Sequence, residues 1–150
     1  MNKLVLIYER KGSLFLGANQ QTTAGVWLDA GPYFTCSSSD EEATIGSLCL
    51  QALEHSKSGV PHPKTHSGMT KPLLLAAGVK SYRTFIKGTK MCMLSASDKY
   101  EITPCRNGGS TGNEKGFHEI AEKTQYLQQA SNVSQLGKAV IQALIACTEK

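Results

Sequence analysis

The sequence lacks the features that mark membrane, secreted or disordered proteins. Its first seven residues include only four consecutive apolar residues, which is too short a run for a secretory or membrane segment. Charged residues make up 19% of the chain and hydrophobic residues 40%, which excludes a disordered composition. The 150 residues therefore predict one domain, residues 1–150, that folds in the cytoplasm.

Paired cysteines are also missing. The five cysteines are an odd number and form no C-x-x-C pair, which favours reduced thiols in a cytosol. The net charge of +4 comes from residues 61–115, which hold nine basic and three acidic residues. This basic segment could contact nucleic acid or an acidic protein, and scattered lysines on solvated strands explain it equally well.

Motifs for catalysis, metal binding and phosphate binding are absent as well. One group of potential metal ligands lies close together in the sequence: His55, His62, His66 and Cys49. Two of its histidines fall in a proline-containing loop without H-E-x-x-H context, so we predict no metal site. Cys105 and His118 could form a nucleophile pair, but nothing nearby lowers a thiol pKa. The sequence thus predicts neither an enzyme nor a cofactor.

The first third of the chain has the pattern of several strands followed by a helix. Short apolar and β-branched runs separated by Gly and Pro predict strands at residues 3–10, 13–18, 26–30 and 33–36. Ser39 and Glu42 fit a capping box, and apolar residues then recur at helical spacing. We therefore expect a helix over residues 41–55.

The rest of the chain shows a similar order. Residues 57–72 contain three of the five prolines and predict a long loop, followed by a short helix at 73–79. Further strands are expected at residues 82–87, 90–95, 100–104 and 120–127, with a Gly-rich loop at 107–116. A last helix is expected over residues 133–147.

The two long helices resemble each other in sequence. Residues 45–53 and 136–144 align without gaps and share Gly, Gln, Ala and Leu at equivalent positions. We interpret segments 1–56 and 80–148 as a pseudo-repeat. The predicted fold is α+β, with two β-β-β-β-α units whose mainly antiparallel, twisted sheets pack around two equivalent helices, and with Leu48 and Leu144 in the core.

The closing segment, S-Q-L-G-K-A-V-I-Q-A-L at residues 134–144, resembles that of contact-dependent growth inhibition immunity proteins, the CdiI family. The resemblance implies a cytoplasmic protein that binds the C-terminal domain of its cognate toxin, expected to be a nuclease, and blocks it sterically. Immunity proteins against nucleases are often acidic, whereas this chain is basic.

A second interpretation follows from the same predicted topology. Two β-β-β-β-α units are similar to Whirly single-stranded-DNA-binding proteins, and the segment K-G-T-K at residues 87–90 resembles their lysine-glycine-lysine motif. Such proteins interleave basic residues with stacking aromatics, and residues 61–115 offer only Tyr82, Phe85 and Tyr100. We therefore expect a protein partner rather than nucleic acid.

Candidate partner-binding residues lie in two segments without apolar periodicity. We expect these residues to be exposed together, and Tyr and Arg are the types that most often become hot spots. The predicted set is Asp98, Lys99, Tyr100, Arg106, Asn113, Glu114 and Lys115.

Overall fold

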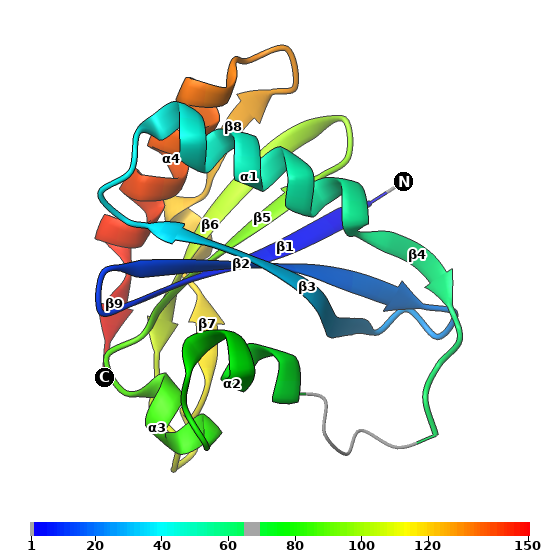
Figure 1. The fold of residues 1–150 in the computed structure, drawn as a ribbon. Coiled ribbons are helices and arrows are strands. Elements are labelled where there is room, and N and C mark those ends of the chain that lie inside the picture. Colours follow the sequence, from blue (N-terminus) through cyan, green and yellow to red (C-terminus); the bar gives the residue numbers. More distant parts are fainter. Residues whose placement is uncertain (1, 65–69) are drawn as a thin grey trace.

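The computed structural model describes residues 2–64 and 70–150, which form a curled nine-stranded sheet with helices on both faces (Figure 1). The strands in chain order are β1 (Lys3–Arg10), β2 (Ser13–Thr22), β3 (Trp27–Ser37), β4 (Lys57–Val60), β5 (Lys90–Ala96), β6 (Lys99–Asn107), β7 (Phe117–Glu119), β8 (Gln125–Gln128) and β9 (Thr148–Glu149). The main path runs β3-β2-β1-β5-β6-β7. Antiparallel pairing of β1 with β5 therefore joins the two halves of the chain.

Three short strands attach to this path. Strand β4 pairs with β2 and β9 pairs with β6, both in parallel, while β8 pairs antiparallel with β6. The first hairpin turns at Lys11 and Gly12, both with positive φ, as a tight two-residue connection between twisted strands requires.

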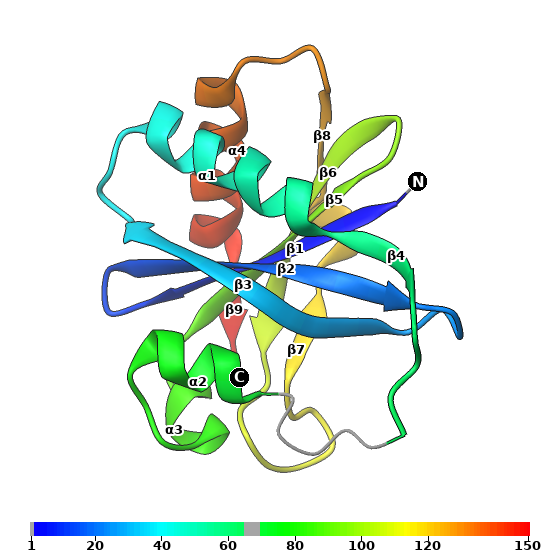
Figure 2. The ribbon, with the colours of Figure 1, turned by 45° about the vertical axis from the view of Figure 1, so that its right-hand side comes forward.

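Helices α1 (Glu42–His55) and α4 (Val133–Ala146) lie together on one face of the sheet (Figure 2). They cover the side chains of alternate strand residues, including Val5, Ile7 and Leu94, all fully buried. The two helices meet at Gly46 and Gly137. A Cβ added at either glycine would overlap the backbone carbonyl of the first residue of the facing helix, Val133 or Glu42. The close approach of the helices therefore depends on both glycines.

The helix starts differ from each other. Asn132 accepts a hydrogen bond from the Gln135 amide while the Gln135 side chain accepts one from the Asn132 amide, which is a capping box. The box predicted for the first helix does not form, because Glu41 occupies its N-cap position without a side-chain bond. Asp40 instead accepts a hydrogen bond from the Ser37 amide at 2.9 Å.

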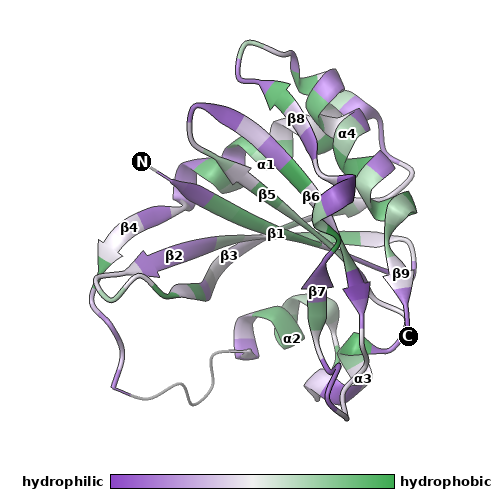
Figure 3. Cartoon of the chain, turned by 180° about the vertical axis from the view of Figure 1, so that it is seen from behind, coloured by the Kyte–Doolittle hydropathy of each residue, from purple (hydrophilic) through white to green (hydrophobic). Residues whose placement is uncertain are grey.

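The other face of the sheet is covered only in part. Helices α2 (Lys71–Ala77) and α3 (Tyr82–Ile86) pack on it through Leu73 and Phe85, which join a second apolar cluster with Tyr8 and Phe15. Seen from behind, α2, α3 and β7 lie toward one end of the long strands, and the end near the N-terminus has no helix in front of it (Figure 3). That end forms an open sheet face.

The structure confirms the α+β class, the mainly antiparallel sheet and the two long helices, within one residue of their predicted ends. Several local predictions were wrong. The strands predicted at 26–30 and 33–36 are one continuous strand, β3, which begins at Trp27, and the long predicted loop contains β4. The predicted strand at 120–127 is a 3-10 turn, η1 (Ala121–Lys123), followed by β8. Leu144 is buried as expected, whereas Leu48 is only half-buried.

The predicted strand at residues 82–87 is helix α3. Ser81 caps it by accepting a hydrogen bond from the Thr84 amide at 3.2 Å. Its buried residues, Phe85 and Ile86, are adjacent in the sequence, whereas neighbouring residues of a strand point to opposite faces. An isolated helical turn of five residues carries too few apolar positions to show its period in the sequence.

Candidate protein-docking surface

The predicted partner-binding residues lie at the two ends of β6. Asp98 lies in the turn between β5 and β6, and Lys99 is the first residue of β6. Arg106 lies near the other end of β6, beside the loop of residues 108–116 that carries Asn113. Eight residue steps along an extended strand separate the ends of β6, roughly 26 Å. The set therefore forms two groups and not one cluster.

Tyr100 differs from the other predicted residues because it lies in the core. Its side chain is 8% exposed and belongs to the apolar cluster beneath α1 and α4. Strand alternation places Tyr100 on the same face as the fully buried Ile102. The expectation that Tyr100 is exposed with its neighbours was wrong, since its position in β6 directs it inward.

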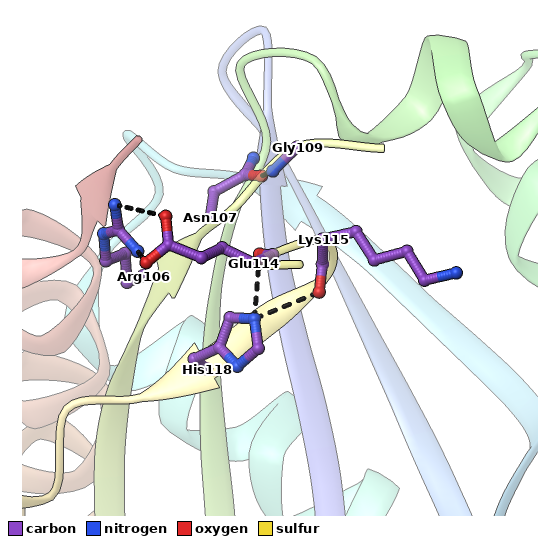
Figure 4. A network of polar contacts seen from close by, with 6 residues as sticks. All are labelled: Arg106, Asn107, Gly109, Glu114, Lys115 and His118. Carbon is purple, nitrogen blue, oxygen red and sulfur yellow. Dashed lines mark hydrogen bonds and ion pairs between the residues drawn. The ribbon is translucent and has the colours of Figure 1, made fainter. Parts of the chain in front are cut away.

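The loop between β6 and β7, residues 108–116, is closely hydrogen-bonded at its base (Figure 4). Gly108 donates to the Gly116 carbonyl and Gly116 to the Gly109 carbonyl, each at 2.8 Å. The buried Asn107 amide group donates to the carbonyls of Ile86 and Thr89, at 2.6 and 2.8 Å. Its Oδ1 accepts from the Gly109 amide, so one side chain ties the loop to α3 and to the start of β5.

Charged and polar contacts also hold the tip of this loop. Arg106 Nη1 lies 3.2 Å from Glu114 Oε1, and His118 Nε2 donates to the carbonyls of Glu114 and Lys115. Hydrogen bonding and charge from Arg106 lower the pKa of the exposed Glu114 carboxyl. Figure 4 shows the Lys115 side chain pointing away from these contacts. Within the described residues, neither Lys115 nor the exposed Asn113 has a side-chain partner.

A groove on the open sheet face was missed by the sequence analysis. It has a volume of about 340 Å³. Its lining residues come from β1, β3, β5, β6 and β7 and from the positions just before β1 and just after β5. They are Asn2, Lys3, Leu4, Trp27, Met93, Ser95, Ala96, Ser97, Glu101 and Glu119. Each strand contributes one to three residues, so no single segment of sequence carries a signal for this groove.

Hydrogen-bond acceptors without donors lie next to the groove. The backbone register places Leu4, Asn19 and Asp29 side by side across β1, β2 and β3. Asn19 is 4% exposed, and its Oδ1 is buried without a hydrogen-bond partner, as is Oδ1 of Asp29. Unpaired buried acceptors are uncommon in folded proteins and cost free energy.

Burial raises the pKa of Asp29. The neighbouring Tyr33 hydroxyl lowers it by a smaller amount. The two groups lie close together, but the Tyr33 hydroxyl does not reach a hydrogen-bonding position and also has no partner in the described part of the chain. The carboxylate is therefore poorly solvated and poorly paired.

The potential nucleophile pair is not brought together. Cys105 lies opposite Glu119 in the sheet and His118 lies opposite Arg106, so the side chains of Cys105 and His118 point to opposite faces. Burial raises the pKa of the Cys105 thiol to about 12. All five cysteines are free thiols.

The histidines considered as metal ligands are engaged elsewhere. His62 Nδ1 lies 3.1 Å from Thr22 Oγ1, and the His55 ring packs near Phe34. His66 lies outside the described residues. Within residues 2–64 and 70–150, no three His, Cys, Asp or Glu side chains are grouped so that they could hold a metal ion. In the same residues, no helix is long and apolar enough to cross a membrane.

Comparisons of sequence identify no relative, because no protein-family model and no curated protein matches the chain. Solved structures do match. A protein of unknown function from Neisseria meningitidis is 16% identical, with a TM-score of 0.77 over 98% of this chain and 96% of its own. One chain of a CdiA-CT/CdiI toxin and immunity complex from Yersinia pseudotuberculosis is also 16% identical, with a TM-score of 0.76 over 99% and 98% of the two chains.

The chain has the fold of one component of a toxin and immunity complex. This agrees, at the level of the fold, with the resemblance of residues 134–144 to immunity proteins. The similarity extends over nearly all of both chains, so no large part of the fold is peculiar to this protein.

Proposed function

We propose that this protein is an immunity protein that binds a toxin delivered by a neighbouring cell and neutralises it. The observation that carries the proposal is the match over 99% of the chain to one component of a CdiA-CT/CdiI complex. That complex contains a toxin and an immunity protein, and the closing segment at residues 134–144 favours the immunity role. The protein then acts by binding and not as an enzyme.

Neutralisation by a protein without catalytic chemistry requires coverage of the toxin's active site or of another essential surface. A nuclease toxin acts on nucleic acid in the cytosol, so the immunity protein must be present there before the toxin arrives. A stable interface needs about 800 Å² from each partner. We propose that the interface includes both ends of β6, the β5–β6 turn and the loop of residues 108–116.

We assign the main contact to the β6–β7 loop. Asn113 and Lys115 are exposed, and the internal bonds of Arg106 and Glu114 hold the loop that presents them. A loop that is already ordered loses less conformational entropy on binding. At the other end of β6, Asp98 and Lys99 extend the surface, whereas the buried Tyr100 supports it from the core.

The direct test requires a candidate toxin domain, which we would seek in the gene immediately upstream of the gene for this chain. Co-expression with that domain should restore growth of a bacterial host that the toxin alone inhibits, and calorimetry should detect a complex. The double substitution Asn113→Ala/Lys115→Ala should weaken binding by about 2 kcal/mol, roughly thirtyfold. The control Glu54→Ala/Lys138→Ala changes exposed residues on α1 and α4 and should bind normally. Absence of both rescue and binding would contradict the proposal.

The alternative, binding of single-stranded nucleic acid, predicts a different result. In its candidate motif, Lys87 is exposed, but Lys90 Nζ lies 4.0 Å from Glu9 Oε1. Binding to a mixed single-stranded oligonucleotide should therefore be weak at physiological salt and should fall as salt competes for phosphates. Sub-micromolar affinity at physiological salt would favour nucleic-acid binding over the immunity function.

A further inference from the structure

The groove on the open sheet face combines negative charge with an apolar floor. Glu101 on β6 and Glu119 on β7 line it from one side, and Trp27 on β3 lines it from the other. Leu4 and Met93 lie between them. Within residues 2–64 and 70–150, neither carboxylate has an ion-pair or hydrogen-bond partner. The groove therefore holds two negative charges that the described chain does not neutralise.

The basic residues nearest to the groove are held away from it. Lys3 lines the groove with part of its side chain, but its Nζ donates a hydrogen bond to the Leu53 carbonyl at 3.0 Å, at the end of α1. The ammonium group of Lys99 lies 4.8 Å from the centre of the Tyr126 ring. Each of these cations has a partner other than Glu101 or Glu119.

The buried acceptors next to the groove add an independent observation. Oδ1 of Asn19 is fully buried without a donor, and Asn19 lies directly beside Leu4, a residue of the groove floor. Oδ1 of Asp29 follows on the next strand, also without a donor. Both side chains share the sheet face of the groove, because directly paired residues in neighbouring strands point the same way. This end of the sheet therefore holds two buried acceptors, Oδ1 of Asn19 and Oδ1 of Asp29, that form no hydrogen bond within the described residues.

We propose that the groove binds a basic side chain, foremost an arginine, from an exposed segment of the partner protein. A guanidinium group carries five N–H donors and no acceptor, which matches the two unpaired carboxylates of Glu101 and Glu119 in the groove lining. Its planar face also stacks on aromatic rings, and Trp27 provides one at the groove wall. The inference deepens the proposed immunity function, on which it rests, by naming the chemistry of the toxin segment.

The inference is compatible with the basic net charge of the chain. The charges at the contact surface, and not the net charge of +4, decide electrostatic complementarity with a partner. Glu101 and Glu119 make the groove acidic although most charges of residues 61–115 are basic. A basic nucleic-acid cleft on the toxin would thus find a complementary site on a basic immunity protein.

A short peptide tests the recognition chemistry without the toxin. Trp27 is the only tryptophan, so its fluorescence reports on the groove alone. Titration of the full chain with an acetylated and amidated Gly-Arg-Gly-Arg-Gly peptide should change this fluorescence to saturation, and high salt should weaken the effect. The matched peptide with citrulline, an uncharged analogue of arginine, should bind at least about tenfold more weakly. Equal responses to both peptides, or no response, would overturn the inference.

The variant Glu101→Gln/Glu119→Gln keeps the shape of both side chains and removes their charge. It should lose the response to the arginine peptide, whereas the control Glu42→Gln/Glu54→Gln, on the far face of the sheet, should keep it. Circular dichroism and thermal unfolding establish that each variant is folded. A folded groove variant that still distinguishes arginine from citrulline would place the basic side chain elsewhere.

The same two variants with the upstream-encoded toxin domain separate this inference from the proposed function. If the natural chain binds the toxin, the groove variant should bind at least about tenfold more weakly than the control. Equal toxin affinity for both variants would remove the groove from the interface and leave the immunity function intact. Failure of the natural chain to bind the toxin would contradict the immunity function, while the peptide titration would still decide whether the groove recognises arginine.

Discussion

The two faces of the sheet differ in how completely helices cover them. One face is closed by α1 and α4, and the residues between them and the sheet form the larger apolar cluster. The other is covered by two short helices at one end only, and it keeps Asn19, Asp29 and Tyr33 with buried polar atoms that have no partner in the described residues. The first face contributes apolar burial to the stability of the fold, whereas the second has polar atoms with which a partner could form hydrogen bonds.

The difference shows where binding energy can come from. A closed apolar face stabilises the folded chain, because its apolar surface is removed from water during folding and not during binding. An open face with unpaired acceptors retains favourable interactions that form only when donors arrive. Substitutions on the two faces should therefore separate into effects on unfolding and effects on binding.

The largest effect is expected on the closed face. Leu144 is 2% exposed, and Leu144→Ala should lower the free energy of unfolding by about 4 kcal/mol, because the substitution leaves a cavity under α4. The matched control is Leu75→Ala on α2, whose side chain is 82% exposed and which should change stability by less than about 0.5 kcal/mol. Urea unfolding measures both, and equal effects would contradict the placement of α4.

The contact between the two helices should be nearly as sensitive. A Cβ at Gly137 would overlap the carbonyl oxygen of Glu42, so Gly137→Ala should separate α1 from α4 and cost about 3 kcal/mol. In an exposed helix the same change would be stabilising by about 1 kcal/mol. Thermal unfolding decides the sign, with Lys138→Ala on the exposed side of α4 as the control.

A smaller effect is expected where the loop of residues 108–116 meets α3. Asn107→Ala removes the side-chain donor of the Thr89 carbonyl and leaves the Ile86 carbonyl with only the Thr89 amide as donor, which should cost about 2 kcal/mol. It should also release the loop, so that amide hydrogen exchange becomes faster at Gly109 and Gly116. Asn113→Ala, at the exposed tip, should change neither quantity. Unchanged exchange in the Asn107 variant would show that the other contacts of the loop hold it without Asn107.

The smallest effect concerns Asp29 and depends on pH. Burial raises its pKa, so the folded protein binds this proton more tightly than the unfolded chain does. The contribution of Asp29 to stability is therefore most favourable below the pKa of the unfolded state and is lost as pH rises through the raised pKa of the folded state. Asp29→Asn should remove this loss, making the variant the more stable protein at pH 7 but not at pH 3. A larger advantage at pH 3 would contradict the assigned burial of Asp29.

Local sequence patterns were sufficient for the long elements and misleading for short ones. The apolar spacing within residues 45–53 and 136–144 placed both long helices, because about four turns repeat the signal often enough to be recognised. The five residues of α3 give no such repetition, and Tyr82–Ile86 looked like a strand. Between Val26 and Cys36, Gly31 and Pro32 suggested a break, yet β3 continues through them.

The candidate site was predictable only in part. The composition of residues 107–116 indicated an exposed loop, and the described loop carries Asn113, Glu114 and Lys115 at its surface. Its rigidity depends on Asn107 reaching α3 and on Arg106 reaching Glu114, which no local pattern shows. Tyr100 was predicted to be exposed because it flanks a turn without apolar periodicity, although its register in β6 directs it to the core.

The sequence by itself determined the α+β class and the two long helices, because these follow from residues close together in the chain. Only the tertiary structure decided which strands lie beside each other and how strongly the sheet curls. That curling brings Trp27 of β3 to the same groove as Met93 of β5 and Glu119 of β7, three strands that are not neighbours in the sheet. Twist accumulates over many strand pairs, so the resulting proximity is a property of the whole sheet and of no single segment.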